Sequence, residues 1–181
     1  MHVAIRQLFC AMVAVGMCLV PGMGSAQELA QAPAQARTGE KSARLAQFEK
    51  DVAQLRALQG VPATLANTGM SLSPVSPSTL LDGRISTDWL MMQQPFVVWL
   101  QNTSTTYFTT ILYWQDVNSS TVHQTSAGVS GGQVVPHITS TCGTVIAYLL
   151  DVYANGAFVA STGANAPDAT DGDPCADAWS I

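Results

Sequence analysis

Basic residues are scarce in this sequence, and they are confined to one part of it. The 181 residues include only seven Lys or Arg, and none lies between Ile85 and Ile181. The same stretch contains seven acidic residues, all of them aspartates: Asp88, Asp116, Asp151, Asp168, Asp171, Asp173 and Asp177. An acidic surface repels phosphate backbones, so the composition argues against nucleic acid as a partner. Contact with an anionic membrane would have to be made through residues 40–59.

Histidine is almost as scarce, which limits the catalytic options. Beyond the N-terminal segment only His123 and His137 occur. A small secreted hydrolase would need one of them as its base, and together with Asp116 they could form a His/Asp metal site. Residues 128–132 (GVSGG) resemble the context of the chymotrypsin-like serine nucleophile, but Val129 replaces the aspartate of that pattern. We interpret this segment as a glycine-rich turn and expect a protein that is not an enzyme.

The N-terminal segment has the composition of a secretory signal. Arg6 precedes an apolar run over residues 8–20, and the small residues Gly24, Ser25 and Ala26 follow. This pattern predicts a signal peptide over residues 1–26 and a secreted or periplasmic protein. The run is shorter than the roughly 20 apolar residues that span a bilayer, which favours cleavage over an uncleaved anchor.

Without that segment, the sequence contains only two cysteines. Cys142 and Cys175 remain, and in an oxidising compartment two cysteines predict a disulfide. Closing a loop of about 33 residues should stabilise the fold by roughly 3–4 kcal/mol.

The first part of the mature chain predicts a tether and then a helix. Residues 27–39 are rich in Ala, Gln and Pro and are expected to be a flexible tether. Residues 40–60 predict an amphipathic helix, because strong helix formers dominate and Leu45, Phe48, Val52 and Leu55 form an apolar stripe. We favour packing of this stripe on the protein's own domain. The alternatives are a short coiled coil between chains and a membrane-acting helix.

The remaining chain predicts a mainly β fold. Residues 61–84 are Pro- and Ser-rich and form a linker, or a strap across a sheet. Residues 85–181 predict a single antiparallel β-sandwich, or a small barrel, with an acidic tail tied by the disulfide. The expected strands cover residues 96–100, 107–117, 121–126, 133–141, 144–153 and 157–162. Pro136 marks an edge strand or a bulge, and Asn155-Gly156 predicts a hairpin turn.

Two strands share the pattern I-x-Y-x-x-D-V. It occurs over residues 111–117 and again over residues 146–152. The repetition predicts two related hairpins, one in each sheet. On the first strand, alternation places Ile111 and Tyr113 on one face and Leu112 and Trp114 on the other. Both faces are largely apolar, which predicts a central strand.

Two groups of residues are candidate ligand sites. Asp168, Asp171 and Asp173 lie within six residues and could offer oxygen ligands to Ca²⁺, although the spacing does not match an EF-hand. The aromatic residues Trp114, Tyr113 and Tyr148 are candidates for binding sugar rings. Most aromatic side chains of so small a domain are also needed in its core.

The function that we favour is a non-enzymatic binding or assembly module of the cell envelope, with a protein partner or a second copy of itself. The strands are rich in Thr and Ser and lack the lysines that commonly protect sheet edges. The alternatives are a carbohydrate-binding module aided by Ca²⁺ and a small secreted hydrolase.

Overall fold

A computed structural model describes residues 28–80, 94–167 and 175–181 of the chain. The chain divides into two compact units, Met1–Ala36 and Arg37–Ile181, and the second contains all of the strands found among the described residues. None of the helices among the described residues is long and apolar enough to cross a membrane.

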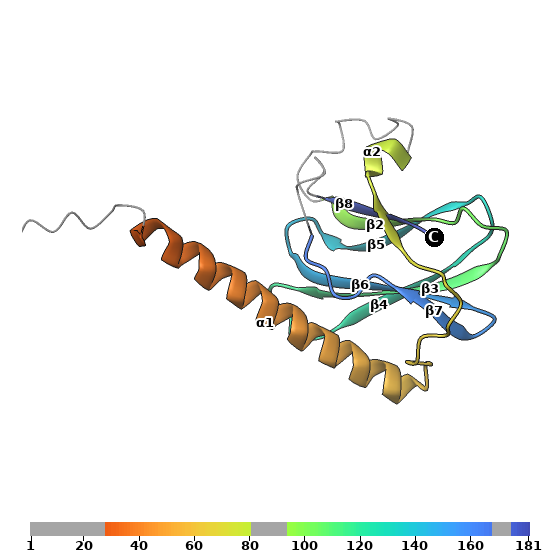
Figure 1. Cartoon of the computed structure of the whole chain (residues 1–181), viewed down its shortest axis with the longest axis horizontal. Helices are drawn as coiled ribbons and strands as arrows, with labels where there is room; N and C mark the ends of the chain where they lie inside the picture. The colour runs from red at the N-terminus through yellow and green to blue at the C-terminus, as the bar shows by residue number, and fades with distance from the viewer. Residues whose placement is uncertain (1–27, 81–93, 168–174) are drawn as a thin grey trace, which may run out of the picture. The chain divides into compact units, whose positions relative to one another are not determined.

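The second unit is a β-sandwich of two four-stranded sheets, which confirms the predicted fold class (Figure 1). Sheet A has the order β1-β8-β2-β5, and sheet B has the order β4-β3-β6-β7. All pairs are antiparallel except β2 with β8. The strands are β1 (Ser73–Val75), β2 (Pro95–Gln101), β3 (Phe108–Asp116), β4 (His123–Val129), β5 (Val134–Thr141), β6 (Val145–Ala154), β7 (Ala157–Ser161) and β8 (Ala176–Ser180).

The main core lies between the two sheets. Leu100 and Phe96 of β2 pack against Leu112 of β3 and Leu150 of β6, and all four side chains are buried. Phe96 also contacts the ring of Tyr148, with 5.6 Å between ring centres. The alternation predicted for β3 is confirmed, because Leu112 and Trp114 belong to this core whereas Ile111 and Tyr113 do not.

A long helix, α1 (Glu28–Gln59), precedes the sandwich. It begins inside the segment that was predicted to be a flexible tether, so the prediction for residues 27–39 was wrong from Glu28 onward. The Ala, Gln and Glu of this segment are strong helix formers, and here they prevail over the internal Pro33. The predicted end is confirmed: Gly60 follows α1 with φ of 66°, in the left-handed region that suits a helix stop.

The apolar stripe of α1 packs against the outer face of sheet B. Phe48 and Val52 are fully buried there, against Tyr113, Ala147 and Leu149. This confirms packing on the protein's own domain. The coiled-coil and membrane hypotheses would require the same side chains, and in the folded unit these are occupied.

The segment 61–84 is more structured than a linker. It contains β1 and a short helix, α2 (Pro77–Leu80). β1 pairs with β8, so this part of the chain closes one side of sheet A. The sequence did not predict β8, which had been assigned to an irregular tail.

The two copies of the I-x-Y-x-x-D-V pattern lie in one sheet. They form β3 and β6, which pair directly, with Tyr113 opposite Leu149 and Ile111 opposite Asp151. The prediction of one copy per sheet was therefore wrong, because both strands are central in sheet B. Asn155 and Gly156 make the turn between β6 and β7 with φ of 50° and 77°, as a type I′ hairpin requires.

The predicted disulfide is present. Cys142 follows β5 and Cys175 precedes β8, and the two are bonded. The bond holds β8 against sheet A. The sequence of β8 is short and rich in alanine, so its intrinsic preference for a strand is weak.

Candidate functional site

Two of the four sheet edges are protected. β1 is only three residues long and contains Pro74, which cannot donate a backbone hydrogen bond. β7 is partly covered by the chain that follows α1, because the Ala66 amide donates to the Phe158 carbonyl over 2.7 Å. Short strands, proline and covering segments are the usual protections against strand association.

The other two edges, β4 and β5, are open in the part of the chain that the structure describes. Neither strand pairs with a further described segment, and neither contains Lys, Arg, Asp or Glu. They lie close to each other, one at the end of each sheet. Pro136 lies on β5, which confirms the predicted edge strand. This pair of strands is the candidate interaction surface, and we call it the open edge.

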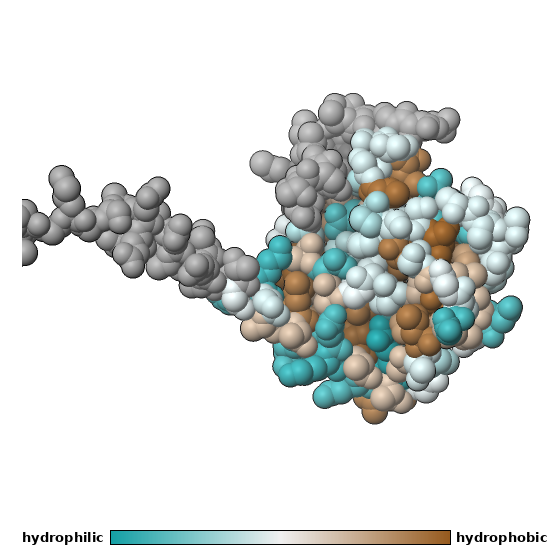
Figure 2. Space-filling model, viewed as in Figure 1, coloured by the Kyte–Doolittle hydropathy of each residue, from teal (hydrophilic) through white to brown (hydrophobic). Residues whose placement is uncertain are grey.

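Most side chains of the open edge are small or apolar. Ile138 of β5 is 58% exposed, although isoleucine is usually among the most buried residues. Ser126 of β4 is also exposed, and so is Gln124. On the face drawn in Figure 2, residues of intermediate hydropathy cover much of the sandwich, with apolar residues scattered among them.

One carboxylate lies among polar groups near the ends of these strands. The Ser140 hydroxyl donates to Asp116, and the Thr144 hydroxyl lies 3.2 Å from the same carboxylate oxygen. His123 lies on the other side, with Nε2 3.8 Å from Asp116, and its ring stacks on Trp114 with 5.5 Å between centres. The cluster therefore joins β3, β4 and β5 to the start of β6.

This cluster does not form a nucleophile–base pair. A serine nucleophile needs its hydroxyl bonded to a base that can accept the proton, usually histidine. The Ser140 hydroxyl is instead bonded to the Asp116 carboxylate, and His123 is beyond hydrogen-bond distance of that carboxylate. The arrangement stabilises the strand ends and offers no evident route to hydrolysis.

His137 lies apart, in the core between the sheets. It is buried, and its Nε2 lies 2.8 Å from the Thr110 hydroxyl oxygen. Thr110 directs its only hydroxyl hydrogen toward the Ala127 carbonyl, 3.1 Å away, so His137 donates from Nε2. Burial lowers the pKa of His137 from 6.5 to about 4, which keeps the ring neutral at pH 7.

The candidate metal sites do not find support in the described residues. His123 is 42% exposed at the surface, whereas His137 is inside the core, so the two do not share a site with Asp116. No group of three or more His, Cys, Asp or Glu in residues 28–80, 94–167 and 175–181 could hold a metal ion. The candidate calcium ligands Asp168, Asp171 and Asp173 lie outside the described residues, so that hypothesis stays a prediction.

The three aromatic residues predicted to bind sugar do not come together on the surface. Tyr113 is buried beneath α1, on the outer face of sheet B. Tyr148 is buried in the core, and its hydroxyl accepts a hydrogen bond from Trp179. Trp114 is half-buried and packs on that same core. Their apolar rings are used in packing, as the sequence analysis noted for most aromatic residues of so small a domain.

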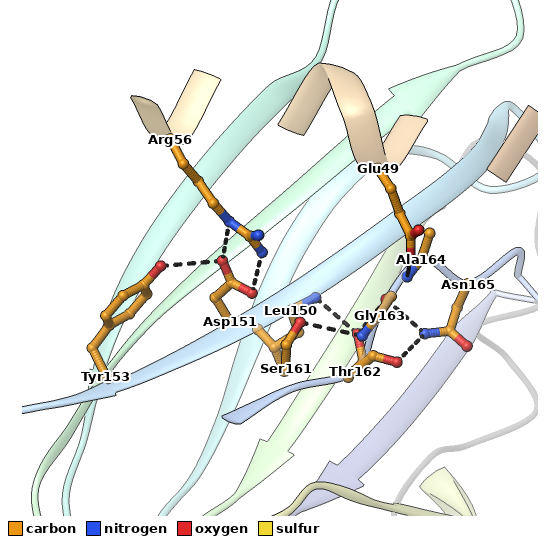
Figure 3. A network of polar contacts seen from close by, with 10 residues as sticks. All are labelled: Glu49, Arg56, Leu150, Asp151, Tyr153, Ser161, Thr162, Gly163, Ala164 and Asn165. Atoms are coloured by element: carbon orange, nitrogen blue, oxygen red, sulfur yellow. Dashed lines mark hydrogen bonds and ion pairs between the residues drawn. The ribbon is translucent and has the colours of Figure 1, made fainter. Parts of the chain in front are cut away.

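A buried ion pair fastens α1 to sheet B (Figure 3). Arg56 donates from Nε and Nη2 to the two carboxylate oxygens of Asp151, over 2.8 and 2.5 Å. The Tyr153 hydroxyl donates to the same carboxylate over 3.2 Å. The guanidinium group also lies 5.7 Å from the ring centre of Tyr113 and 5.3 Å from that of Phe158. The pair is bidentate, so it fixes the orientation of the helix as well as its position.

The electrostatics of this network are those of a sealed interface. The Asp151 side chain is fully buried, and that burial raises the pKa of its carboxyl, while the Arg56 guanidinium opposes the rise. Burial also raises the pKa of Tyr113 and of Tyr153, so both phenols stay neutral. Near the middle of α1, Glu49 accepts a hydrogen bond from the Ala164 amide, which adds a second attachment. The network holds α1 on sheet B.

The sequence analysis did not find this ion pair. In the sequence, Asp151 belongs to the repeated pattern and Arg56 lies within the range of the predicted helix, and nothing in either position links the two. An aspartate inside an otherwise apolar strand was the available signal, because a buried carboxylate needs a partner. The identity of that partner, 95 residues away, had no local signature.

The comparisons with known proteins found no match to a family model, to a curated protein or to a solved structure.

Proposed function

We propose that this protein is a secreted or periplasmic, non-enzymatic binding and assembly module of the cell envelope. The observation that supports this function is the open edge, formed by two uncharged edge strands, β4 and β5, at one side of the sandwich. Exposed backbone donors and acceptors on an edge strand are a template for another strand. The partner is an extended segment of another protein or a second copy of this chain.

The different treatment of the four edges supports a binding role. A protein that only had to remain monomeric would be expected to protect every edge. Here β1 is short and carries a proline, β7 is partly covered, and β4 and β5 lack charge. The disulfide between Cys142 and Cys175 is consistent with an oxidising compartment, because such bonds persist outside the cytosol.

The test is the oligomeric state of the mature protein, residues 27–181, by light scattering over a range of concentrations, with and without Ca²⁺. We expect an oligomer, or a monomer that is cross-linked to a specific envelope protein. The variant Ser126→Lys/Ile138→Lys places one charge on each open strand and should abolish the association. Gln54→Lys is the matched control, because Gln54 is exposed on α1 away from the open edge.

Circular dichroism would establish that each variant is folded. A wild-type protein that is monomeric at every concentration, and that gives the same cross-linking pattern as the double variant, would contradict the proposal. A change in mass that requires Ca²⁺ would instead place the association under the control of Asp168, Asp171 and Asp173.

A further inference from the structure

The loop between β2 and β3 is fixed by a fully buried asparagine. The Asn102 side-chain amide donates to the carbonyls of Thr106 and Val129, over 2.6 and 3.2 Å. Its oxygen accepts from the Ser104 amide and from the Ser104 hydroxyl, over 2.9 and 2.8 Å. An asparagine side chain has two donor hydrogens and two acceptor positions, and all four are used here.

The same loop is held from the other side by the turn between β4 and β5. The backbone amide of Asn102 donates to the Gln133 carbonyl, and the backbone amide of Gly132 donates to the backbone carbonyl of Asn102. A side chain at position 131 would place its Cβ 2.5 Å from the Ser104 carbonyl oxygen, so only glycine permits this approach. Residues 102–106 therefore form a rigid support.

This support presents an exposed aromatic residue, Tyr107. Its side chain is 60% exposed, although it directly precedes the buried Phe108. Its hydroxyl lies where a side chain of residue 128 would be, 2.0 Å from a Cβ built on Gly128. The ring thus crosses β4 at a glycine and leaves most of its surface to solvent. Packing among the described residues does not explain a ring that is positioned but left mostly exposed.

The described side chains that share this face with Tyr107 near β4 are polar and uncharged. Thr109 of β3 lies opposite Gly128 of β4, and alternation along the strands places Tyr107, Thr109 and Ser126 on the outer face of sheet B. Thr109 and Ser126 are both exposed. The surface offers one aromatic face and two hydroxyl groups.

We propose that Tyr107 and these neighbouring side chains bind a neutral polysaccharide. The C–H groups on one face of a pyranose ring pack on an aromatic ring, and its hydroxyls bond to Thr and Ser side chains. The side chains of Tyr107, Thr109 and Ser126 carry no charge, which matches an uncharged ligand and disfavours an ionic one. Fixing the loop beforehand reduces the conformational entropy that is lost when the ligand binds.

This site differs from the aromatic residues that the sequence suggested. It shares Ser126 with the open edge, but the ring of Tyr107 lies on the outer face of sheet B, whereas association would use the backbone of β4 and β5. Substitutions of Tyr107 therefore test polysaccharide binding separately from association.

The test is native affinity electrophoresis of the mature protein in gels that contain hydroxyethylcellulose, galactomannan or dextran. We expect at least one of these to retard the wild-type protein. Tyr107→Ala should weaken binding at least about tenfold, as truncation of an aromatic anchor commonly does. Tyr107→Phe keeps the ring and should retain binding, and Gly128→Ala should lose it because the new Cβ displaces the ring.

Val117→Ala is the matched control, because Val117 is 56% exposed and lies outside the proposed surface. Each gel is run with EDTA as well, so that retention in EDTA separates this site from the aspartates of residues 168–173. A wild-type protein retarded by none of the three polysaccharides overturns the proposal. Equal retardation of the wild type and Tyr107→Ala does so too. Light scattering of Tyr107→Ala should show the same oligomeric state as the wild type.

Discussion

The outer face of sheet B is divided into a covered half and an open half. In the covered half, Tyr113 and Leu149 lie beneath α1, and Asp151 is bonded to Arg56. In the open half, the uncharged residues Thr109 and Ser126 are exposed. Both halves are built on the same strand, β3, by the same alternation of side chains. The difference between the two halves therefore comes from α1, which packs on one half of the face.

The two halves also differ in the interactions that hold their side chains in place. The covered half is fixed by apolar burial and one buried ion pair. The open half is fixed by the neutral hydrogen bonds of Asn102, which lie behind the exposed surface and leave it accessible. Substitutions in the covered half should therefore change stability, and substitutions in the open half should change binding.

The largest effect is expected from Arg56→Met. Removing the cation leaves the buried Asp151 carboxylate without its main partner, which costs about 3–5 kcal/mol of unfolding free energy. The double variant Arg56→Met/Asp151→Leu should recover most of this loss, because no buried charge remains. Urea unfolding followed by circular dichroism measures both. A loss below about 0.5 kcal/mol for Arg56→Met would show that the covered half is not held by this pair.

The second effect is a dependence of stability on pH, which comes from His137 in the core between the sheets. The pKa of His137 is about 4 in the folded protein, against 6.5 for an ordinary histidine. Between these values the unfolded state binds more protons, so stability falls as the pH is lowered through this window. The loss should approach about 3 kcal/mol, at 1.36 kcal/mol for each pKa unit.

The variant His137→Gln separates this effect from the aspartates that also titrate on acidification. Urea unfolding at several pH values between 7 and 4 gives the unfolding free energy as a function of pH. This free energy should fall less steeply with decreasing pH in the variant than in the wild type. His123→Gln, at the surface, is the control and should keep the wild-type slope. Equal slopes for all three proteins would show that His137 does not remain neutral in the core.

A smaller effect is expected from Asn102→Ala, which removes the support of the open half. The carbonyls of Thr106 and Val129 lose a buried donor, and the cost should be about 1–3 kcal/mol. Polysaccharide binding should weaken as well, because Tyr107 is no longer fixed. Asn118→Ala, in an exposed turn, is the control and should leave both unchanged. Full stability in Asn102→Ala would show that the loop is held by other contacts.

The smallest effect on stability is expected from Tyr107→Ala. The ring is mostly exposed, so the unfolding free energy should stay within about 0.5 kcal/mol of the wild type. Urea unfolding measures this alongside the binding experiment. A loss of 2 kcal/mol or more, taken as a rough threshold, would identify the ring as a packing residue and remove the distinction between the two halves.

Most strand positions were predictable from the sequence, because alternation and turn residues are local signals. Of the eight strands in the part of the chain that the structure describes, six lie close to their predicted ranges, and Pro136 correctly marked an edge. β1 and β8 were not predicted. Their sequences, SPV and ADAWS, have weak strand propensity, and they become strands through their pairing with each other and with β2.

The candidate sites were less predictable than the fold. Tyr113 and Tyr148 are buried and so cannot bind sugar at the surface. Their burial depends on which faces of sheet B are covered by α1 and by sheet A. Tyr107 had no pattern of its own, because its position follows from the hydrogen bonds of Asn102 and from the absence of a side chain at Gly128. Such contacts between distant segments cannot be read from spacing alone.

The position of β8 constrains when this protein can fold. In sheet B each hairpin, β3 with β4 and β6 with β7, brings together neighbouring parts of the chain. In sheet A, β8 lies between β1 and β2, although it is the last of the strands to be synthesised. Among the described strands β1 pairs only with β8, so its pairing must wait for residues 176–180. A nascent chain therefore cannot complete sheet A until this segment has left the ribosome, whereas the hairpins of sheet B need no contribution from it.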